Sequence, residues 1–581
     1  MSVQETLLFI LCAVAVIVAI RWVADRTGLP AAALLTIVGI LYAVLPGPNV
    51  ELEPHIILTF VIPPLLYSAA LDSSLLDIRR NTRTVISLSV LLVLATAMLV
   101  GVGFDLWVHG ATLAAGVALG AAIAPPDPVA ALAVGRKAGL PGNLITLIQG
   151  EGLLNDATAL TILTVAAAAA EGGGFSFPAA AGRFLLSSAG GVVAGVVVAY
   201  AVRFLRHLRD DPLSANAISL SAPFVAYLIG ESVHVSGVLA VVVAGLMIGH
   251  DAPRHASGAS RLQTGAVWRL VDFLLEGVVF LLIGQQLPKV VERLADYDTS
   301  TIAVAVAVSV GVVLLLRPLW LVLTQLLPRS LHTRLGGGTE PDADTSLDTA
   351  TEPDADAEAD AGAEAGGGGK PDGEANGKLR GRIFEKALNS REVTAMSWAG
   401  TRGVITLAAI FTLSDKIPDL PLLHFCAFVV VLVTLIGQGL TFGPLVRRLG
   451  LRANHTDLAR ERNEARSAAV RAALDRLDEI KQQRHDNVED RAIESMRKQL
   501  EIRLDRYRRR LDMLEKADSD ELPVSPQYEA ALGVRRQVID AQREELLRWR
   551  DAGNLNDEGL RVLERELDHE ERLLPDRSTR A

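Results

Sequence analysis

Long runs of apolar residues, separated by short polar segments, occupy most of the chain up to about residue 450. About thirteen such runs can be drawn, and a run of about 17 to 25 apolar residues is long enough to cross a bilayer as a helix. They lie near residues 3–23, 30–46, 54–71, 83–103, 111–134, 144–170, 184–205, 213–230, 235–249, 266–286, 301–327, 395–414 and 421–445. The pattern predicts an all-α polytopic membrane protein with about 13 transmembrane helices.

An acidic segment interrupts this pattern after the eleventh apolar run. Residues 335–380 contain twelve Asp or Glu against three Lys or Arg, a net charge of −9 in a chain whose total is −10. Gly, Ala, Pro and acidic residues cannot bury enough apolar surface to fold, so a disordered cytoplasmic linker is expected. A plain spacer is a better interpretation than a cation-attracting segment. The linker separates helices 1–11, in residues 1–334, from helices 12–13, in residues 381–451.

The pattern changes again at residue 452, where the chain becomes strongly charged. In residues 452–581, apolar positions such as Leu474, Leu477 and Ile480 recur at helical spacing with charged residues between them. This spacing predicts a charged helical cytoplasmic tail whose amphipathic helices pair with one another, as a coiled coil, or with a second subunit. A solvated helical tail without a regulatory role fits equally well.

Lys and Arg residues are distributed unevenly between alternate short loops. One set of loops holds Arg21, Arg26, Arg79, Arg80, Arg83, Arg136, Lys137, Arg203, Arg206, Arg209, Arg254, Arg261 and Arg269. The opposite set holds only Arg183, Lys289, Arg293 and Lys416. Because basic loops stay in the cytoplasm, the N-terminus is expected on the outer side of a plasma membrane. After thirteen crossings, the C-terminus is expected on the cytoplasmic side.

Two of the apolar runs contain residues that break a helix. The first, GAAIAPPDPVAALAV, carries Pro126, Asp127 and Pro128 at its middle, and an ionised carboxylate in hydrocarbon costs roughly 2.5 to 3.5 kcal/mol. The second, EVTAMSWAGTRGVITLAAI, is interrupted around Arg402 and Gly403. Irregular backbone at membrane depth survives only inside protein or beside water, so the pair predicts two broken helices that cross near the midplane. A simple hinge at the second break is the alternative.

Charged side chains at these breaks need compensation. Asp127 would lie at the crossing, and Arg402 would offset the partial charges of the half-helix ends and compensate Asp127. Both roles presuppose that the two breaks meet in space.

A third run, LIQGEGLLNDATALTILTV, brings Glu151, Asn155 and Asp156 into an apolar span. Ionisable residues at this depth usually mark an ion path or a proton relay, although structural hydrogen bonds between helices are the alternative. Arg317, within the eleventh run, cannot lose its charge and is expected to pair with Glu151, or else to extend toward the cytoplasmic surface. The roles of Glu231 and Glu276, which also approach predicted spans, stay open.

The motifs PPDPVAA, GEGLLNDATAL and SWAGTRGVITLA occur in this order within residues 1–450. Together they resemble the monovalent cation:proton antiporters of the first cation:proton antiporter family, the sodium/proton exchangers with an Asn-Asp pair in the sixth helix. The resemblance implies inverted repeats, a six-helix core that moves against a dimerisation domain, and an ion held where the broken helices cross. It also implies a homodimer in the lipid bilayer, with no cofactor, enzymatic reaction or nucleic acid.

By motif position, the resemblance assigns the cation and proton site to Asp127 and Asp156, its support to Asn155, and a stabilising ion pair to Glu151 and Arg317. Arg402 and Gly403 fall in the second broken helix.

Two positions depart from the family pattern. Many members have Thr at the position of Pro126 and Ser at that of Gly152, so two hydroxyl ligands are missing here. Na⁺ is the expected substrate, with Li⁺ next and K⁺ as the alternative; a cation channel and a membrane-anchored sensor are less favoured. Alternating access with competition between cation and proton is expected. Because Asn155 carries no proton, exchange is expected to be electroneutral.

Overall fold

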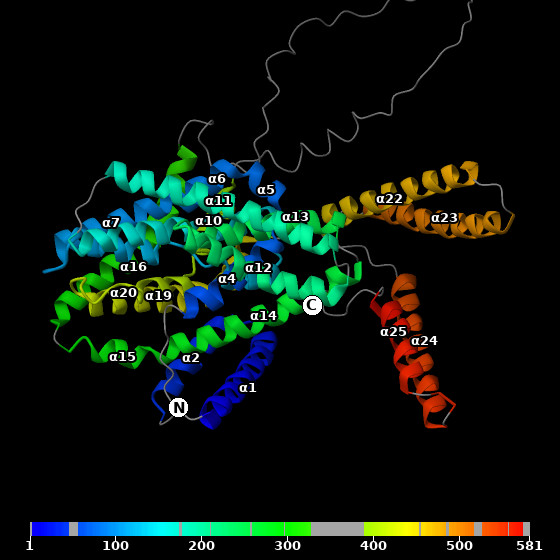
Figure 1. Cartoon of the computed structure of the whole chain (residues 1–581), viewed down its shortest axis with the longest axis horizontal. Coiled ribbons are helices and arrows are strands. Elements are labelled where there is room, and N and C mark those ends of the chain that lie inside the picture. Colours follow the sequence, from blue (N-terminus) through cyan, green and yellow to red (C-terminus); the bar gives the residue numbers. More distant parts are fainter. Residues whose placement is uncertain are drawn as a thin grey trace, which may run out of the picture. The chain divides into compact units, whose positions relative to one another are not determined.

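The computed structural model describes most of the chain outside the predicted acidic linker. The described residues are 3–45, 56–172, 177–208, 211–255, 258–295, 297–326, 388–451, 455–483, 487–515, 526–552, 554–555 and 557–572. They form helices and no β-strand, and they divide into two units, Met1–Ala453 and Asn454–Ala581 (Figure 1). The predicted linker, residues 335–380, lies outside the described residues.

The first unit contains helices at all thirteen predicted apolar runs. Its elements are α1 (Val3–Thr27), α2 (Ala31–Ala43), η1 (Ile57–Val61), α4 (Ile62–Leu71), α5 (Leu75–Arg80), α6 (Thr82–Ile86), η2 (Ser87–Leu91), α7 (Leu92–Trp107), α8 (Leu113–Ile123), α9 (Pro128–Lys137), α10 (Gly142–Ala170), α11 (Phe177–Leu208), α12 (Pro212–Ser232), α13 (Gly237–His255), α14 (Gly258–Gln285), α15 (Leu287–Glu292), α16 (Thr299–Leu326), α18 (Ser390–Trp398), α19 (Val404–Ile410), α20 (Leu420–Leu432), η4 (Val433–Gln438) and α21 (Gly439–Leu449).

Among the described residues, 8 helices are long and apolar enough to cross a membrane, and further apolar helices are shorter. The all-α, multi-pass architecture predicted from the sequence is therefore confirmed, while the count of 13 crossings and the inverted repeats stay predictions.

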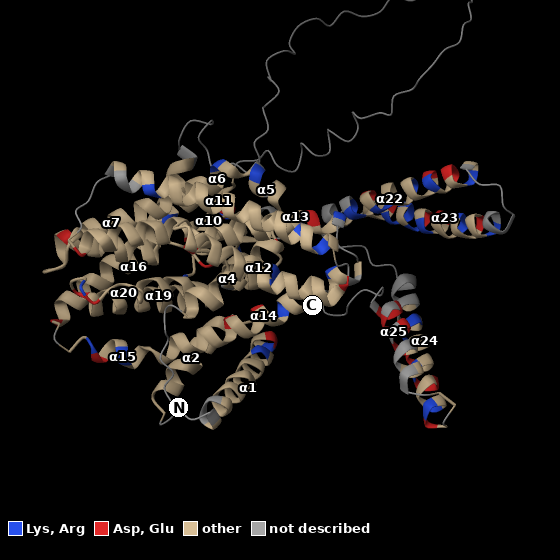
Figure 2. Cartoon of the chain, viewed as in Figure 1, with Lys and Arg blue, Asp and Glu red and all other residues tan. Residues whose placement is uncertain are grey.

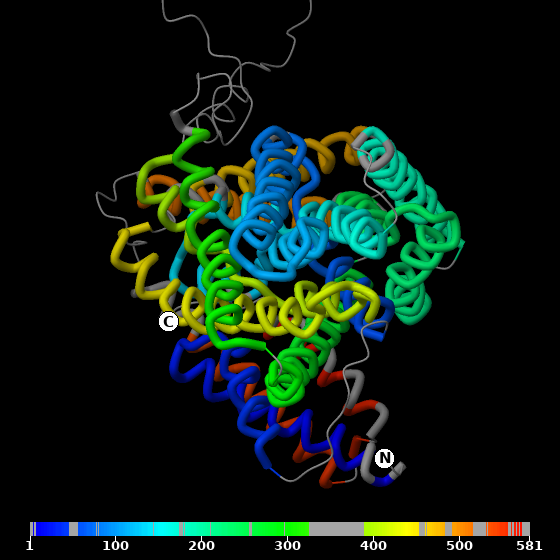
Figure 3. The backbone as a smooth tube through the Cα atoms, turned by 90° about the vertical axis from the view of Figure 1, so that its left-hand side faces the viewer, coloured from blue at the N-terminus to red at the C-terminus, as the bar shows by residue number. Residues whose placement is uncertain are grey.

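Two sets of helices can be followed inside this unit. In one, α14 packs against α1, α2, α4 and α12, and α13 packs against α4, α11 and α12 (Figures 1 and 3). In the other, α8 packs against α7, α10, α19 and α20. The sets meet where α4 contacts α10 and where α14 contacts α19.

Small residues allow a close approach of α2 and α14. A Cβ placed on Gly39 would lie 3.0 Å from the Cα of Gly284, which leaves no room for a side chain at this crossing. Small residues at helix interfaces permit such close backbone packing in membrane proteins.

Both predicted helix breaks are present, and they meet. The first lies between Ile123, where α8 ends, and Pro128, where α9 begins; the second lies between α18 and α19. The Asp127 amide donates a hydrogen bond to the Thr401 carbonyl (2.6 Å), and the Thr401 hydroxyl donates to the Asp127 carbonyl (2.8 Å). Each break therefore satisfies backbone groups that the other exposes, as irregular backbone inside a membrane requires.

The second unit consists of highly charged helices. It contains α22 (His455–Gln483), α23 (Asn487–Glu515), α24 (Pro526–Asp551) and α25 (Asp557–Arg572). α22 packs against α23 and α24 against α25, and Leu477 is buried in the first pair. Lys, Arg, Asp and Glu cover these helices, in contrast to the mostly uncharged helices of the first unit (Figure 2).

Candidate ion-binding site

Asp127 stands at the start of α9, and its local sequence explains that position. Its Oδ1 accepts a hydrogen bond from the Val129 amide (2.9 Å), so Asp127 is the N-cap of α9. Pro128 is the first residue of that helix, where its missing amide hydrogen costs nothing. The same sequence that ends one half-helix therefore begins the next, with a carboxylate at the junction.

A cavity of about 120 Å³ lies beside this junction. Asp127, Asp156 and Glu276 line it, and these three carboxylates come from the first break, from α10 and from α14. The Asp156 side chain is buried. The cavity is large enough for a small cation accompanied by water, and its acidic lining favours a positive charge.

Asn155 connects α10 to the first break. Its side-chain Nδ2 donates to the Pro126 carbonyl (3.1 Å), a carbonyl that an unbroken helix would have used internally. Its Oδ1 is buried and has no hydrogen-bond partner within the described residues. Asn155 therefore holds the first break against α10 and leaves one buried oxygen without a partner there.

Glu151 and Arg317 form a buried, bidentate ion pair. Arg317 donates from Nη1 to Glu151 Oε1 and from Nη2 to Glu151 Oε2, the latter over 2.8 Å. Its Nε donates to the Met396 carbonyl (2.9 Å). The two residues are 1 % and 2 % exposed, so the pair joins α10, α16 and α18 in the interior.

Arg402 places its charge at the end of α8. Its Nε donates to the Ile123 carbonyl (2.9 Å), its Nη2 to the Ala124 carbonyl (3.1 Å) and its Nη1 to the Gly400 carbonyl. A helix C-terminus carries free carbonyls and partial negative charge, which a cation stabilises. The described contacts of this guanidinium thus go to carbonyls at the end of α8 and in the second break, and the expected compensation of Asp127 is not by direct contact.

Two glycines are required by the close packing around the carboxylates. A Cβ on Gly403 would overlap the Asp127 carboxylate. A Cβ on Gly152 would lie 2.5 Å from Cγ and 2.7 Å from Cδ of Pro128. The departure from Ser at position 152 therefore has a steric reason in this chain.

Glu276 is the cavity residue that sequence reasoning left unassigned. The acid within the run 266–286 was visible, but which side of α14 faces the carboxylates depends on how α14 packs. One turn before it, Asp272 accepts a hydrogen bond from the Ser68 hydroxyl (2.5 Å). Glu231, also unassigned, is exposed on α12 and does not line this cavity.

The family model of the transmembrane sodium/hydrogen exchangers matches residues 12–448. The chain belongs to this family. An exchanger of this family is a cation/proton antiporter, a transporter rather than an enzyme, and the K⁺ alternative is not favoured.

Curated relatives extend the match toward the C-terminus. The exchanger is 29% identical over 556 residues to an uncharacterised Na⁺/H⁺ exchanger of Mycobacterium tuberculosis, covering 94% of this chain and 92% of the relative. It is 27% identical over 452 residues to the Na⁺/H⁺ antiporter ApNhaP of Aphanothece halophytica, covering 77% of this chain and 74% of that protein.

A solved structure has the same fold. The sodium proton antiporter MjNhaP1 from Methanocaldococcus jannaschii superimposes with a TM-score of 0.55 and 16% identity, covering 77% of this chain and 99% of that one.

Proposed function

We propose that this antiporter exchanges Na⁺ for H⁺ at Asp127 and Asp156. The observation that carries the proposal is that both carboxylates line one cavity beside the crossing of the broken helices. Hard cations are bound by carboxylate, carbonyl and water oxygens, and protons bind the same carboxylates. A cation and a proton therefore compete for one site.

The charge of the two carboxylates explains why the site would cross the membrane only with a cation or a proton bound. Two ionised carboxylates without a counter-charge resist exposure to a hydrophobic barrier, whereas binding of a cation or a proton reduces that cost. Glu276 belongs to α14, which packs with α1, α2 and α4, whereas Asp127 and Asp156 lie in the set around α8. We propose that Glu276 faces Asp127 and Asp156 from the set of helices that contains α14. In this proposal Glu276 takes part in ion binding when the site is open to one side of the membrane.

Na⁺ is preferred in this proposal, with Li⁺ second. Pro126 and Gly152 supply no hydroxyl, so the remaining oxygens must come from the carboxylates, the buried Asn155 Oδ1, backbone carbonyls or water. A small ion is suited to a cavity of about 120 Å³ with few fixed ligands.

Everted membrane vesicles test this selectivity. A pH gradient, acidic inside the vesicles, is followed by dye fluorescence, and Na⁺, Li⁺ or K⁺ is added at several values of pH. Na⁺ should dissipate the gradient at the lowest concentration, followed by Li⁺. A lower half-saturating concentration for K⁺ than for Na⁺ would reverse the selectivity while leaving antiport intact.

We further propose a stoichiometry of one cation for one proton, because Asn155 stands where a second proton carrier would be needed. Purified protein in liposomes should then show the same rate of Na⁺-driven pH change at zero potential and at about −100 mV, a field worth ~2.3 kcal/mol per uncompensated charge. A marked dependence on potential would contradict this stoichiometry.

The arrangement in the membrane is also part of this proposal. We place the N-terminus outside and residues 335–380 and 452–581 in the cytoplasm of a plasma membrane, from the distribution of Lys and Arg. The antiporter is proposed to be a homodimer, as the family resemblance implies. Labelling of single cysteines introduced at Arg183 and Arg136 with an impermeant reagent tests the orientation, since only the former should react from outside.

A further inference from the structure

A second, larger cavity lies in the first unit, between the ends of α11 and α13. Its volume is about 680 Å³, and Arg203, Arg206, His207 and Asp251 line it. Ligand sites commonly measure about 300 to 1,000 Å³. None of the residues that line the ion cavity lines this one, so it is a separate feature of the molecule.

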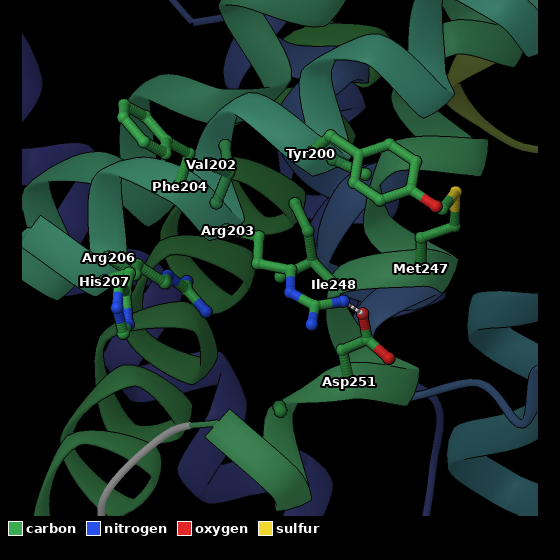
Figure 4. A pocket seen from close by; sticks show the side chains of 11 residues that line it. Tyr200, Val202, Arg203, Phe204, Arg206, His207, Met247, Ile248 and Asp251 are labelled. Atoms are coloured by element: carbon green, nitrogen blue, oxygen red, sulfur yellow. Dashed lines mark hydrogen bonds and ion pairs between the residues drawn. The ribbon is translucent and has the colours of Figure 1, made fainter.

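The charged groups of this cavity have a net charge of +1 when His207 is neutral, from two arginines and one aspartate. Figure 4 shows Arg203 and Arg206 reaching into the same space, with Asp251 facing Arg203. Arg203 Nη1 lies 3.5 Å from Asp251 Oδ2, a long contact that uses one of five guanidinium donors. The cavity therefore keeps one unit of positive charge for an anion.

Arg206 gives an independent indication of a missing acceptor. Its Nε is buried and has no hydrogen-bond partner in the part of the chain that the structure describes. Buried donors are nearly always paired, and a guanidinium pairs best with carboxylate or phosphate oxygens. Simple extension of both arginines to water would leave this buried Nε unexplained.

The surface next to the cavity is apolar. Five large exposed residues follow each other at helical spacing along α11: Val193, Val197, Tyr200, Phe204 and Leu208. This helix is among those long and apolar enough to cross a membrane, so the stripe is suited to contact with acyl chains. Tyr200 and Phe204 belong to both the stripe and the cavity lining, which makes the two continuous.

We propose that this cavity binds the phosphodiester headgroup of an anionic phospholipid, with an acyl chain along the exposed stripe of α11. The arginines donate to the phosphate oxygens, and the single excess positive charge matches a headgroup with one negative charge. Basic cavities between transmembrane helices are suited to anionic headgroups. A soluble phosphate would account for the arginines but not for the apolar stripe that enters the same cavity.

Thermal unfolding of the purified full-length protein tests this site. The delipidated protein in a neutral detergent is titrated with phosphatidylglycerol, with phosphatidylcholine or with inorganic phosphate. Phosphatidylglycerol should raise the unfolding temperature by several degrees, and the other two should not. Arg206→Gln and Arg203→Gln should each weaken the apparent affinity for phosphatidylglycerol about fivefold, the equivalent of about 1 kcal/mol per basic residue.

Arg183→Gln is the matched control, because it removes one positive charge from the opposite end of the same helix and should leave the affinity unchanged. Native mass spectrometry gives a second readout: one retained phosphatidylglycerol should be lost in Arg206→Gln and kept in Arg183→Gln. Arg203, which is half-exposed, supplies the test should Arg206→Gln fail to fold.

Three results would overturn the proposal. Equal stabilisation by phosphatidylcholine would mean that headgroup charge is not recognised. Equal stabilisation by inorganic phosphate would identify a site for soluble anions. Unchanged affinity for phosphatidylglycerol in both arginine variants would place the lipid elsewhere. None of these results depends on ion exchange, so they do not bear on the ion site.

Discussion

Ion pairs between arginine and a carboxylate occur in both units of the chain, in opposite surroundings. Glu151 and Arg317 are buried between helices of the first unit, whereas Asp505 and Arg509 lie on the surface of α23 with 54% and 76% of their side chains exposed. The charges of a buried pair must be satisfied by protein groups, whereas the charges of an exposed pair are hydrated whether or not the pair forms. The same chemistry is therefore expected to matter greatly in the first unit and little in the second.

This comparison also separates two kinds of buried charge. The carboxylate of Glu151 is matched by a guanidinium, while Asp127 and Asp156 line a cavity with a third acid, Glu276. A buried ion pair stabilises the packing of helices, whereas buried carboxylates without a counter-charge favour binding of a cation or a proton from outside the chain. The two classes should separate experimentally, because substitutions of the first should affect folding and those of the second transport.

The largest effect is expected at the unmatched carboxylates. Asp156→Asn and Asp127→Asn should each abolish Na⁺/H⁺ exchange, because each removes a negative ligand that can also bind a proton, with little change in size. Exchange is measured in everted vesicles, and the amount of protein in the membrane by immunoblot.

Glu231→Gln is the control for this experiment, since it neutralises an exposed carboxylate outside the cavity and should retain exchange. Near-normal transport by either aspartate variant would remove that residue from the proposed site.

The matched pair comes second. Glu151→Ala should leave the buried Arg317 guanidinium without its carboxylate partner. This should lower the free energy of unfolding by about 3 to 5 kcal/mol and reduce the yield of folded protein. Glu151→Gln combined with Arg317→Gln should recover part of that loss, because two neutral amides can bond to each other. Yield is measured by size-exclusion chromatography in detergent; a double variant no better than the worse single one would count against mutual dependence.

The sequence alone predicts the elements of this fold well, since each apolar run and both breaks are present as helices and interruptions. It also predicts that Glu151 and Arg317 lie together, because a permanent charge in an apolar run has few partners to choose from. The targets of Arg402 were less predictable: any carbonyl near the crossing can accept its donors, and only the packed structure selects Ile123 and Ala124.

Glu276 shows where such prediction ends. Its place in the cavity depends on the rotation of α14 against the helices around α8, which no local pattern determines. The steric role of Gly152 is similar, since it follows from the position of the Pro128 ring across the gap.

Glu276→Gln should give an intermediate effect. The proposed role of Glu276 is to bind the cation from the opposite set of helices, so its neutralisation should raise the half-saturating Na⁺ concentration several-fold while keeping exchange at saturating Na⁺. The measurement is a Na⁺ titration in everted vesicles at fixed pH. Unchanged Na⁺ dependence would show that Glu276 lines the cavity without binding the ion; complete loss would place it with Asp127 and Asp156.

The smallest effect is expected at the exposed pair of the second unit. Asp505→Asn removes one partner of an i,i+4 pair on α23, and such surface pairs contribute about 0.3 to 0.5 kcal/mol to a helix. The partner, Arg509, stays hydrated when the carboxylate is neutralised, so no buried charge is stranded. Thermal unfolding of the full-length protein should therefore change by less than about 1 °C, and exchange in vesicles should be unaffected. A destabilisation comparable to that of Glu151→Ala would mean that this surface is buried against another part of the assembled protein, and the contrast between the two units would no longer hold for α23.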